Sequence, residues 1–231
     1  MDASECPMHP TPFVDETNTH HQQRTNERTI LIPMRKIIVI SMISLDGVLQ
    51  APGGPDEDTT GGFEYGGWTA SYGDAEFQRL YAPLMEPHDI LVGRTTFDIF
   101  EAYWPTHADF WPGINEVTKY AVSTTRHESD WANTVFLGGV DDIRALTQSG
   151  DADLIVWGSG DLIQTLLEND LVDELQLVIY PVTLGSGKKL FARGTMPAAF
   201  TMIDGAVTSG GVVFARYARG GDIVTGHVGP E

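Results

Sequence analysis

Residues 154–162 read Leu-Ile-Val-Trp-Gly-Ser-Gly-Asp-Leu, a stretch that passes from an apolar run through a glycine turn into a helical pattern. The apolar run predicts a buried strand, and apolar residues at positions 162, 163, 166 and 167 predict the inner face of a helix. Glycines at such a turn let the backbone approach a ligand, and a helix start offers unpaired N–H groups to an anion. The stretch alone leaves two alternatives open, a phosphate site or a tight strand-to-helix connection.

A second strand end carries groups that also suit a phosphate. Residues 89–93 predict a short buried strand, and a helix opens directly after it at Arg94 and continues through Tyr103. Thr95 or Thr96 can cap that helix, and the Arg94 guanidinium can pair with a phosphate.

A third strand end repeats this logic. Residues 120–123 predict a strand, and Thr124, Thr125 and Arg126 place hydroxyl groups and a cation at its end. Open α/β sheets bind ligands beyond the carboxyl ends of their strands, so three such ends predict one anion-binding edge. The alternative for Arg94 and Arg126 is a solvated surface charge.

Length and charge exclude several classes of protein. A chain of 231 residues is most simply one domain with one core. The formal net charge of −18 argues against a nucleic-acid partner, which needs a basic surface. No apolar run approaches the length of a membrane-spanning helix, so we expect no membrane partner. Cys6 is the single cysteine, which excludes a disulfide framework and is compatible with a cytoplasmic protein.

The two ends of the chain differ from its middle. Residues 1–33 are polar and lack the apolar core of a secretory signal, so we expect a flexible N-terminal tail. His9, His20 and His21 could bind a metal there, but a polar tail is the favoured interpretation and no metal is expected. Residues 34–219 are predicted to form a single domain, and residues 220–231 a second flexible tail.

The order of the predicted elements gives the fold class. Strands are expected at 36–42, 89–93, 120–123, 134–137 and 153–157, helices at 77–84, 94–103, 141–148 and 162–167, and a long loop at 44–68. Residues 174–182 form a long β run, and residues 200–207 and 211–217 read as a hairpin. We therefore expect an α/β fold with a mixed, mainly parallel central sheet, flanking helices and antiparallel C-terminal edge strands.

Several motifs, taken together in this order, resemble the dihydrofolate-reductase-like superfamily. The segment 171–191 in particular resembles the RibD C-terminal reductase domain of riboflavin biosynthesis, and the resemblance covers roughly residues 35–218. The motifs are Ser-Leu-Asp46-Gly47 after the first strand, Gly93-Arg94-x-Thr96-Phe97, Gly158-Ser159-Gly160, and Pro181-Val-x-Leu-Gly185-x-Gly187-Lys188-x-Leu-Phe191.

The resemblance implies an NADPH-dependent reductase that reduces a small heterocycle, similar to 5-amino-6-(5-phosphoribosylamino)uracil reductase, and a homodimer. It also implies three cofactor-binding segments, since cations and helix starts suit phosphates. These are Gly93, Arg94, Thr95 and Thr96 for phosphates, Ser123, Thr124 and Arg126 for the 2′-phosphate, and Gly158, Ser159, Gly160, Asp161 and Leu162 for the pyrophosphate.

Two departures limit what the resemblance implies. Bifunctional riboflavin enzymes also carry a cysteine-rich zinc deaminase, which one cysteine cannot supply. Dihydrofolate reductases place a carboxylate on the first helix, and the matching position falls near Phe77, which argues against a folate substrate. Two alternatives to the heterocycle reductase stay open. One is a non-catalytic nucleotide-binding or dimerisation module of the same fold, and the other is a dihydrofolate or pterin reductase.

Asp46 is the candidate catalytic acid, because a carboxylate in a loop crossing the site can orient a substrate or deliver a proton. The alternative is an Asp-Gly turn in which the side chain bonds to nearby backbone. Candidate substrate residues are Asp46, Gly47, Tyr72 and Trp104, with Trp68 and Trp111 as further walls and Asp74 and Glu76 as reserve acids. Such aromatic residues can equally form a core or a dimer interface.

The β run at 174–182 also bears on assembly. Its Leu175, Leu177 and Ile179 share one face, and Val178 and Tyr180 make the other face partly apolar. No helix follows it, so we expect an uncovered surface, extended by the hairpin, that pairs in a homodimer. The alternative is that the helix at 160–168 and the aromatic stretch near Trp104 cover this surface within one chain.

Overall fold

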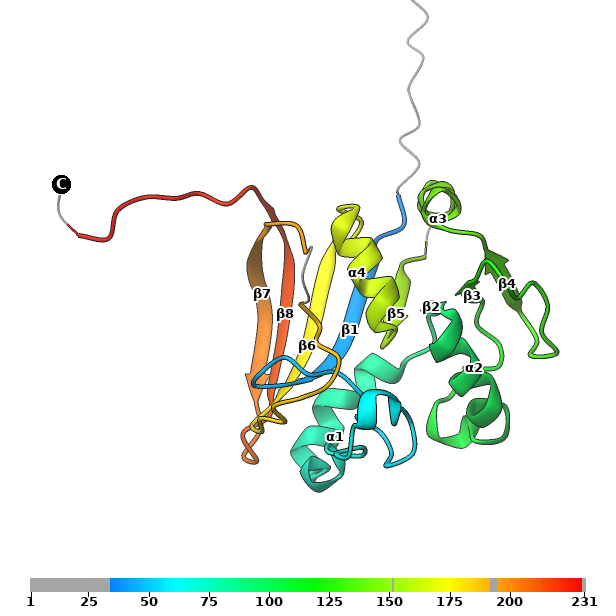
Figure 1. The fold of residues 1–231 in the computed structure, drawn as a ribbon, viewed down its shortest axis with the longest axis horizontal. Helices are drawn as coiled ribbons and strands as arrows, with labels where there is room; N and C mark the ends of the chain where they lie inside the picture. The colour runs from blue at the N-terminus through cyan, green and yellow to red at the C-terminus, as the bar shows by residue number, and fades with distance from the viewer. Residues whose placement is uncertain (1–33, 151, 192–194, 230–231) are drawn as a thin grey trace, which may run out of the picture. The chain divides into compact units, whose positions relative to one another are not determined.

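The computed structural model describes residues 34–150, 152–191 and 195–229, and an eight-stranded sheet organises them (Figure 1). The strands are β1 (Ile37–Ser44), β2 (Asp89–Gly93), β3 (Lys119–Val122), β4 (Thr134–Leu137), β5 (Leu154–Trp157), β6 (Glu174–Tyr180), β7 (Ala199–Val207) and β8 (Val213–Gly221). The α-helices are α1 (Ala75–Tyr81), α2 (Arg94–Tyr103), α3 (Val140–Thr147) and α4 (Gly160–Glu168). Short 3₁₀ helices are η1 (Thr60–Gly62), η2 (Ala70–Tyr72), η3 (Ala82–Met85), η4 (Trp104–Thr106) and η5 (Ala108–Phe110).

The strand order is β4-β3-β2-β5-β1-β6-β8-β7. The first six strands in this order are parallel, whereas β8 pairs antiparallel with both β6 and β7. This arrangement confirms the predicted mixed, mainly parallel sheet with antiparallel C-terminal edge strands. The predicted tail at 1–33, with Cys6 and three of the histidines, lies outside the described residues. At the other end β8 continues to Gly221, two residues into the segment predicted as a tail.

The sheet is buried on both faces around its central strand, β1. Val39 of β1 pairs with Val156 of β5 and with Leu175 of β6 in parallel register. Branched apolar side chains fill β1 because a parallel strand covered on both sides leaves no solvent-facing position.

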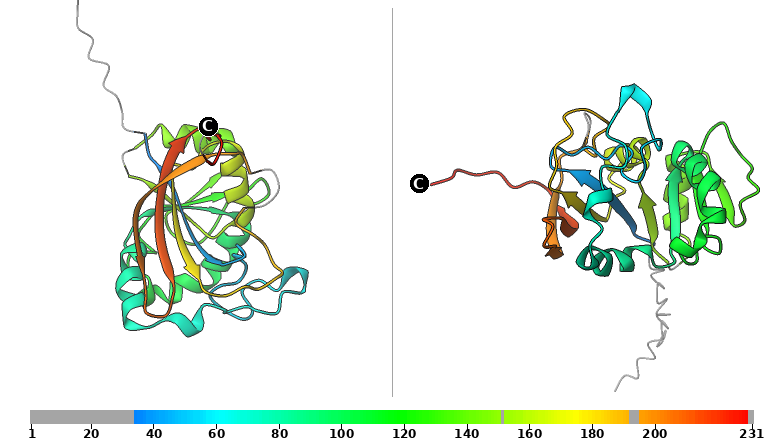
Figure 2. Two further views of the ribbon diagram at one scale, coloured as in Figure 1. Left: turned by 90° about the vertical axis from the view of Figure 1, so that its left-hand side faces the viewer. Right: turned by 90° about the horizontal axis from the view of Figure 1, so that it is seen from below.

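Different helices cover the two faces of the sheet (Figure 2). On one face α3 and α4 bury Ile143, Ile163 and Leu166 against β1, β5 and β6. On the other face α2 buries Phe97, whose ring centroid lies 5.5 Å from that of Phe136 of β4. Each helix presents an apolar stripe at helical spacing, so the 3.6-residue pattern of the sequence correctly gave the helices that pack on the sheet.

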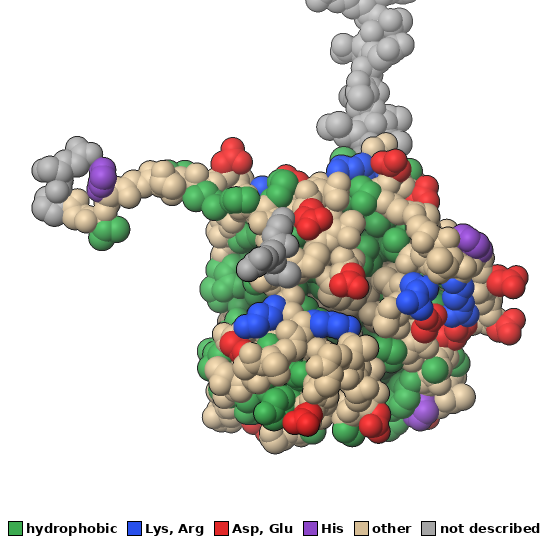
Figure 3. Space-filling view, in the orientation of Figure 1, with side chains coloured by type: hydrophobic (Ala, Val, Ile, Leu, Met, Phe, Trp, Pro, Cys, Tyr) green, Lys and Arg blue, Asp and Glu red, His purple; other side chains and the backbone are tan. Residues whose placement is uncertain are grey.

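The expectation that the second face of β6 lies uncovered is wrong. Val178 and Tyr180 are each 1% exposed and pack against Phe77 of α1 and against Val212. The cover comes from α1, a helix far earlier in the chain, so the absence of a helix after β6 did not leave the strand open. Exposed apolar side chains on β7, the edge strand, are Met202, Ile203 and Val207. Figure 3 shows apolar surface along the left side of the molecule, the side on which Figure 1 places β7.

Among the described residues, every helix is too short or too polar to cross a membrane.

Candidate functional site

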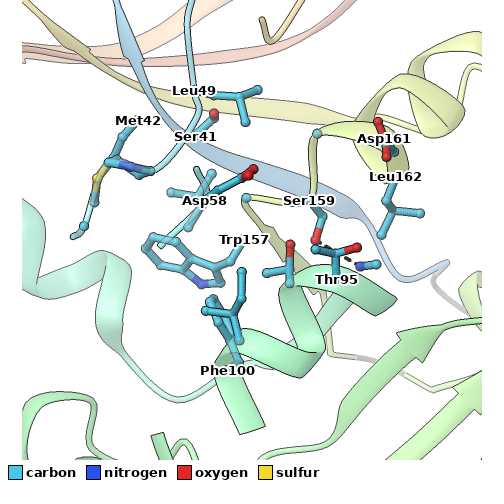
Figure 4. Close-up of a pocket in the computed structure, with 18 of the residues that line it drawn as sticks. Ser41, Met42, Leu49, Asp58, Thr95, Phe100, Trp157, Ser159, Asp161 and Leu162 are labelled. Carbon is cyan, nitrogen blue, oxygen red and sulfur yellow. Dashed lines mark hydrogen bonds between the residues drawn. The ribbon is translucent and has the colours of Figure 1, made fainter. Parts of the chain in front are cut away.

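A cavity of about 730 Å³ lies at the carboxyl ends of β1, β2 and β5 (Figure 4). Four kinds of wall surround it: the start of α2, the start of α4, the loop at 49–58, and a group of aromatic side chains. A volume of this size suits a small organic ligand. The predicted site residues that line it are Gly93, Arg94, Thr95, Thr96, Trp104, Trp111, Gly158, Ser159, Gly160, Asp161 and Leu162.

The start of α4 forms one end of the cavity. Gly158 has a positive φ of 52°, and Ser159 follows it in the left-handed conformation with φ 62°. No side chain caps this helix, and Ser159 Oγ instead accepts a hydrogen bond of 2.9 Å from the Gly93 N–H. The turn therefore leaves the first N–H groups of α4 without a side-chain cap, which is the arrangement that suits an anion.

The start of α2 lies beside it, because the Ser159–Gly93 hydrogen bond joins the ends of β5 and β2. The prediction that Thr95 or Thr96 caps α2 is wrong: Gly93 is the N-cap, and no side chain makes a capping hydrogen bond. The two threonines lie within the first turn and line the cavity. Arg94 lines it too, and its Nη1 donates to Asp98 Oδ2 at 2.7 Å.

At the third predicted strand end Val122 lines the cavity, but the polar residues predicted to bind the 2′-phosphate, Ser123, Thr124 and Arg126, do not. Ser123 is buried, and its Oγ accepts hydrogen bonds from the backbone N–H groups of Thr125 and Arg126. Arg126 donates to Asp98 at 2.8 Å and to Glu101 at 2.7 Å. These carboxylates, Glu101 foremost, raise the pKa of Arg126. Arg126 is thus already paired with acidic side chains of α2.

Asp46 lies outside the residues that line the cavity. Its Oδ1 accepts hydrogen bonds from Ser44 Oγ at 2.6 Å and from the Leu184 N–H at 3.1 Å, and its Oδ2 accepts one from the Gly185 N–H at 2.9 Å. These bonds, that of Ser44 foremost, lower the pKa of Asp46 to about 2. The carboxylate is ionised near neutral pH and joins two loops, which favours a structural role over proton delivery.

Two of the other substrate candidates also lie elsewhere. Tyr72 packs against Tyr180 with ring centroids 5.4 Å apart. Gly47 closes a turn, because its backbone N–H donates a hydrogen bond to the carbonyl oxygen of Ser44. Asp74 caps α1 by accepting from the Phe77 N–H at 2.7 Å. Glu76 similarly accepts from the Ser209 N–H, and Trp68 packs against Tyr180.

The aromatic wall contains residues that sequence reasoning missed. Trp157 ends β5 directly before the glycine turn, and its ring lies 5.3 Å from Trp111. Trp111 in turn contacts Trp104 at 5.0 Å and Phe100 at 5.8 Å. The position of Trp157 at the carboxyl end of a central strand is a signal that could have identified it.

The loop wall carries the cavity's other charged groups. Asp58 Oδ2 and Lys188 Nζ form an ion pair of 2.7 Å. Glu57 Oε2 accepts from the Gly53 N–H at 2.7 Å, and burial raises the pKa of Glu57. Long-range contacts place these residues, since Lys188 lies 130 positions from Asp58.

Ser41 of β1 is a polar group in an apolar part of the lining. It is 3% exposed, and its Oγ has no hydrogen-bond partner among the described residues. A buried hydroxyl without a partner is costly, and one that lines a cavity is available to a ligand.

Comparisons with known proteins bear on the family and the fold of the chain. The family model of the RibD C-terminal domain matches residues 35–214. The uncharacterized protein YyaP of Bacillus subtilis (strain 168) is 28% identical over 194 residues, which span 80% of this chain and 96% of YyaP.

Two solved structures have the same fold. A candidate riboflavin biosynthesis protein from Shewanella sp. PV-4 superposes with a TM-score of 0.57 at 25% identity, covering 80% of this chain and 99% of the other. Dihydrofolate reductase from Enterococcus faecalis, complexed with NADP(H) and RAB-propyl, gives a TM-score of 0.53 at 11% identity, covering 80% and 96%. At that identity the second likeness concerns the fold alone.

Proposed function

This chain belongs to the RibD C-terminal domain family, as its motifs predicted, and we propose on that basis that it is an NADPH-dependent reductase of a small heterocyclic substrate. One observation carries the proposal: two helix N-termini without side-chain caps open into one cavity, which continues to an aromatic wall. Phosphates suit the first feature, and planar rings suit the second.

The residues present fit a dinucleotide. The first turns of α2 and α4 would hold its phosphates, with Thr95 and Thr96 supplying hydroxyl groups and Arg94 a cation. Gly93 lies between them, and a side chain added there would meet Leu162 and Ser159 at about van der Waals distance, so the backbone approaches closely. Ser41 Oγ, buried and without a partner among the described residues, supplies a hydrogen-bonding group for the same ligand.

When bound, a dihydronicotinamide would supply the hydride, and the chain's own residues would bind, orient and exclude water. Trp157 and Trp111 are each less than one-tenth exposed and give this part of the cavity a dry wall. The protein can therefore favour the reaction by position and exclusion of water, without a residue that takes electrons.

A non-catalytic nucleotide-binding module of the same fold is the second candidate. The observation that favours it is that two candidate proton donors already have partners. The Asp46 carboxylate joins two loops, and Asp58 forms an ion pair with Lys188. The two candidates differ in one measurement, because only the enzyme oxidises NADPH faster when a substrate is added.

Calorimetric titration with NADPH tests the shared part of both candidates. We expect saturable binding, and absence of binding at millimolar cofactor would refute both. A Thr95→Asp variant makes the test specific, since a carboxylate in the first turn of α2 stabilises the helix but repels a phosphate. Its thermal midpoint should be unchanged or higher, while NADPH binds about tenfold more weakly.

Ala75→Asp is the matched control. Ala75 is an exposed residue in the first turn of α1 and does not line the cavity. The variant carries the same change of charge at a helix start and should bind NADPH as the parent does. Equal losses in the two variants would show that net charge, and not the α2 site, sets the affinity.

A further inference from the structure

Resting on the proposed function, we propose that Glu57 is the proton donor of the reduction. Its Oε1 would protonate the heteroatom of a C=N or C=O bond of the heterocycle when a hydride is added to the carbon. Glu57 lines the cavity from the loop at 49–58, whereas Asp46, the acid that the sequence favoured for this role, lies outside the lining. Each hydride that reduces such a bond needs one proton, and this side chain is placed to supply it.

The Glu57 carboxyl group is held by one oxygen and open at the other. Oε2 accepts hydrogen bonds from the N–H groups of Gly53 and Gly54, at 2.7 and 3.3 Å. Oε1 has no hydrogen-bond or ion-pair partner among the described residues. Because the two N–H groups donate, Oε2 acts as an acceptor, and a proton bound by the carboxyl group sits on Oε1. The acidic proton is therefore on the oxygen that the loop does not engage.

Buried contacts fix the loop that carries Glu57. Gln50 is buried, and its Nε2 donates to the backbone oxygens of Asp58 and Thr60, each at 3.0 Å. The Oε1 atom of Gln50 accepts from the Lys188 N–H at 3.0 Å. The chain around Glu57 is thus held before a ligand binds, and an acid whose position is fixed in advance loses little freedom when it meets a substrate.

The two neighbouring carboxyl groups of the loop wall have pKa values that move in opposite directions. Burial raises the pKa of Glu57, the backbone N–H groups on its Oε2 oppose this, and the charge of Asp58 adds to it. Burial also acts on Asp58, but hydrogen bonds from Lys188 and Thr60 outweigh it and lower the pKa of Asp58. Neighbouring acids whose environments separate their pKa values can take different roles. Glu57 is the one that keeps its proton to higher pH.

The other charged side chains of the described lining have other places or partners. Arg94 and Asp161 lie in the first turns of α2 and α4, where the cofactor phosphates are proposed. Asp58 and Lys188 form an ion pair of 2.7 Å. Within the described lining, Glu57 is therefore the acid that has a free oxygen and lies away from the helix starts.

The loop wall borders the part of the cavity that lacks a hydrogen-bond partner for Ser41. In Figure 4 Asp58, the chain neighbour of Glu57, lies between Ser41 and Trp157 and away from Asp161 at the start of α4. Ser41 Oγ is buried and without a partner among the described residues, so a ligand that satisfies it comes to this region. The end of the ligand remote from the helix starts is the end that approaches the loop wall.

The step balances with Glu57 as its acid. A C–H bond forms on the substrate carbon, the π electron pair of the C=N or C=O bond moves to the heteroatom, and that atom bonds to the proton of Glu57. The carboxylate that remains takes a proton from water. Substrate, NADPH and one proton thus give reduced substrate and NADP⁺.

Glu57→Gln tests this role because it keeps the contacts of the side chain. The amide oxygen of Gln can accept from Gly53 and Gly54 as Oε2 does, and only the titratable proton is lost. The probes are 5-amino-6-(5-phosphoribosylamino)uracil and dihydrofolate, assayed as NADPH oxidation by the full chain. For a probe that the parent reduces, kcat should fall about a hundredfold or more, with KM and NADP⁺ affinity near the parent values. A variant with the kcat of the parent would overturn the inference.

The pH profile separates proton donation from a structural role. Since a general acid acts only while it is protonated, kcat of the parent should fall as pH rises through the pKa of Glu57, and Glu57→Gln should lack this fall. Glu64→Gln is the matched control, because Glu64 is an exposed acid of the same long loop and does not line the cavity. It should keep the parent profile, and a Glu57→Gln profile like that of the parent would contradict the role of Glu57.

A readout without turnover separates the failure of this inference from that of the proposed function. Calorimetry with NADP⁺ comes first, and absence of binding refutes the dinucleotide site. NMR of the NADP⁺ complex, with glutamate labelled at its carboxyl carbon, then identifies Glu57 by the signal that Glu57→Gln lacks. We expect this signal to titrate above the usual glutamate range. Titration within or below that range overturns the role of Glu57 and leaves the reductase proposal standing, whereas a parent that binds NADP⁺ and reduces neither probe contradicts both.

Discussion

Arg126 Nη1 donates a hydrogen bond of 2.8 Å to Asp98 Oδ1, which joins the end of β3 to the outer face of α2. The other oxygen of Asp98 accepts from Arg94 at 2.7 Å, so one carboxylate serves both arginines that the sequence assigned to phosphates. A phosphate at either guanidinium has to compete with Asp98. The acid therefore tunes how strongly this edge of the sheet attracts an anion.

Removal of the Asp98 charge should strengthen binding of the phosphorylated cofactor. In Asp98→Asn both guanidinium groups lose an ionised partner, and we expect NADPH affinity to rise about three- to tenfold. NADH affinity should rise less if either arginine meets the 2′-phosphate. Parallel calorimetric titrations of the two cofactors measure this, and a fall in NADPH affinity would contradict the assignment.

Loss of Arg94 should have the opposite effect. Charge-assisted hydrogen bonds contribute about 1.5–3 kcal/mol each, and Arg94→Ala should reduce the free energy of NADPH binding by an amount in that range. NADH affinity falls much less only if Arg94 contacts the 2′-phosphate and not the pyrophosphate. The parent protein should prefer NADPH, and equal affinity for the two cofactors would refute a 2′-phosphate site.

Sequence patterns that span a few residues predicted the strands and helices well, but they did not predict contacts between residues far apart in the chain. β2 and β4 begin and end at the residues that the sequence predicted, because each is a short apolar run with polar neighbours. The contact of Asp46 with Leu184 spans 138 positions, and no local pattern reports such a pairing. The cover of Tyr180 by Phe77 was missed for the same reason.

The same distinction holds for the candidate site: its parts formed by adjacent residues were predicted, and its parts formed by distant residues were not. The glycine turn after β5 lines the cavity where the sequence placed it, since a strand, a turn and a helix start are adjacent in the chain. The aromatic wall collects Trp157, Trp111 and Phe100 from separate elements, and only packing brings them together. Asp58 and Lys188 meet through loops whose course the sequence does not specify.

Ser41→Ala should raise stability and weaken ligand binding together. A buried hydroxyl without a partner costs about 1–3 kcal/mol, so its removal should raise the free energy of unfolding of the unliganded protein by up to that amount. If Ser41 Oγ bonds to the cofactor, NADPH should bind several-fold more weakly. Urea unfolding and calorimetry give the two values, and unchanged NADPH affinity would exclude Ser41 from the site.

Asp46 should stabilise the fold in a pH-dependent way. Its pKa in the folded protein, about 2, lies below the unfolded value, so its contribution is present above the unfolded pKa and is lost as pH falls through the folded pKa. Asp46→Asn should therefore lower the free energy of unfolding by about 1–2 kcal/mol near neutral pH. The difference from the parent should shrink between about pH 5 and about pH 2.

The kinetics of the same variant separate the two roles of Asp46. A structural carboxylate leaves kcat for NADPH oxidation near the parent value, whereas a proton donor costs at least about a hundredfold. Asp56→Asn, an exposed acid in the same loop, is the control and should change neither stability nor rate.

The exposed edge of the sheet should mediate a homodimer. Within residues 34–150, 152–191 and 195–229, β7 pairs only with β8, and its other edge has no strand partner there. Its Met202, Ile203 and Val207 are 53%, 48% and 61% exposed. Burying such a strand across a two-fold axis removes both the apolar side chains and the free edge from water.

Ile203→Asp should give the mass of one chain by light scattering at micromolar concentration, where the parent gives the mass of two. Val224→Asp places the same charge on an exposed apolar residue outside the sheet and should stay dimeric. A parent protein with the mass of one chain would show that the edge of β7 is not an interface.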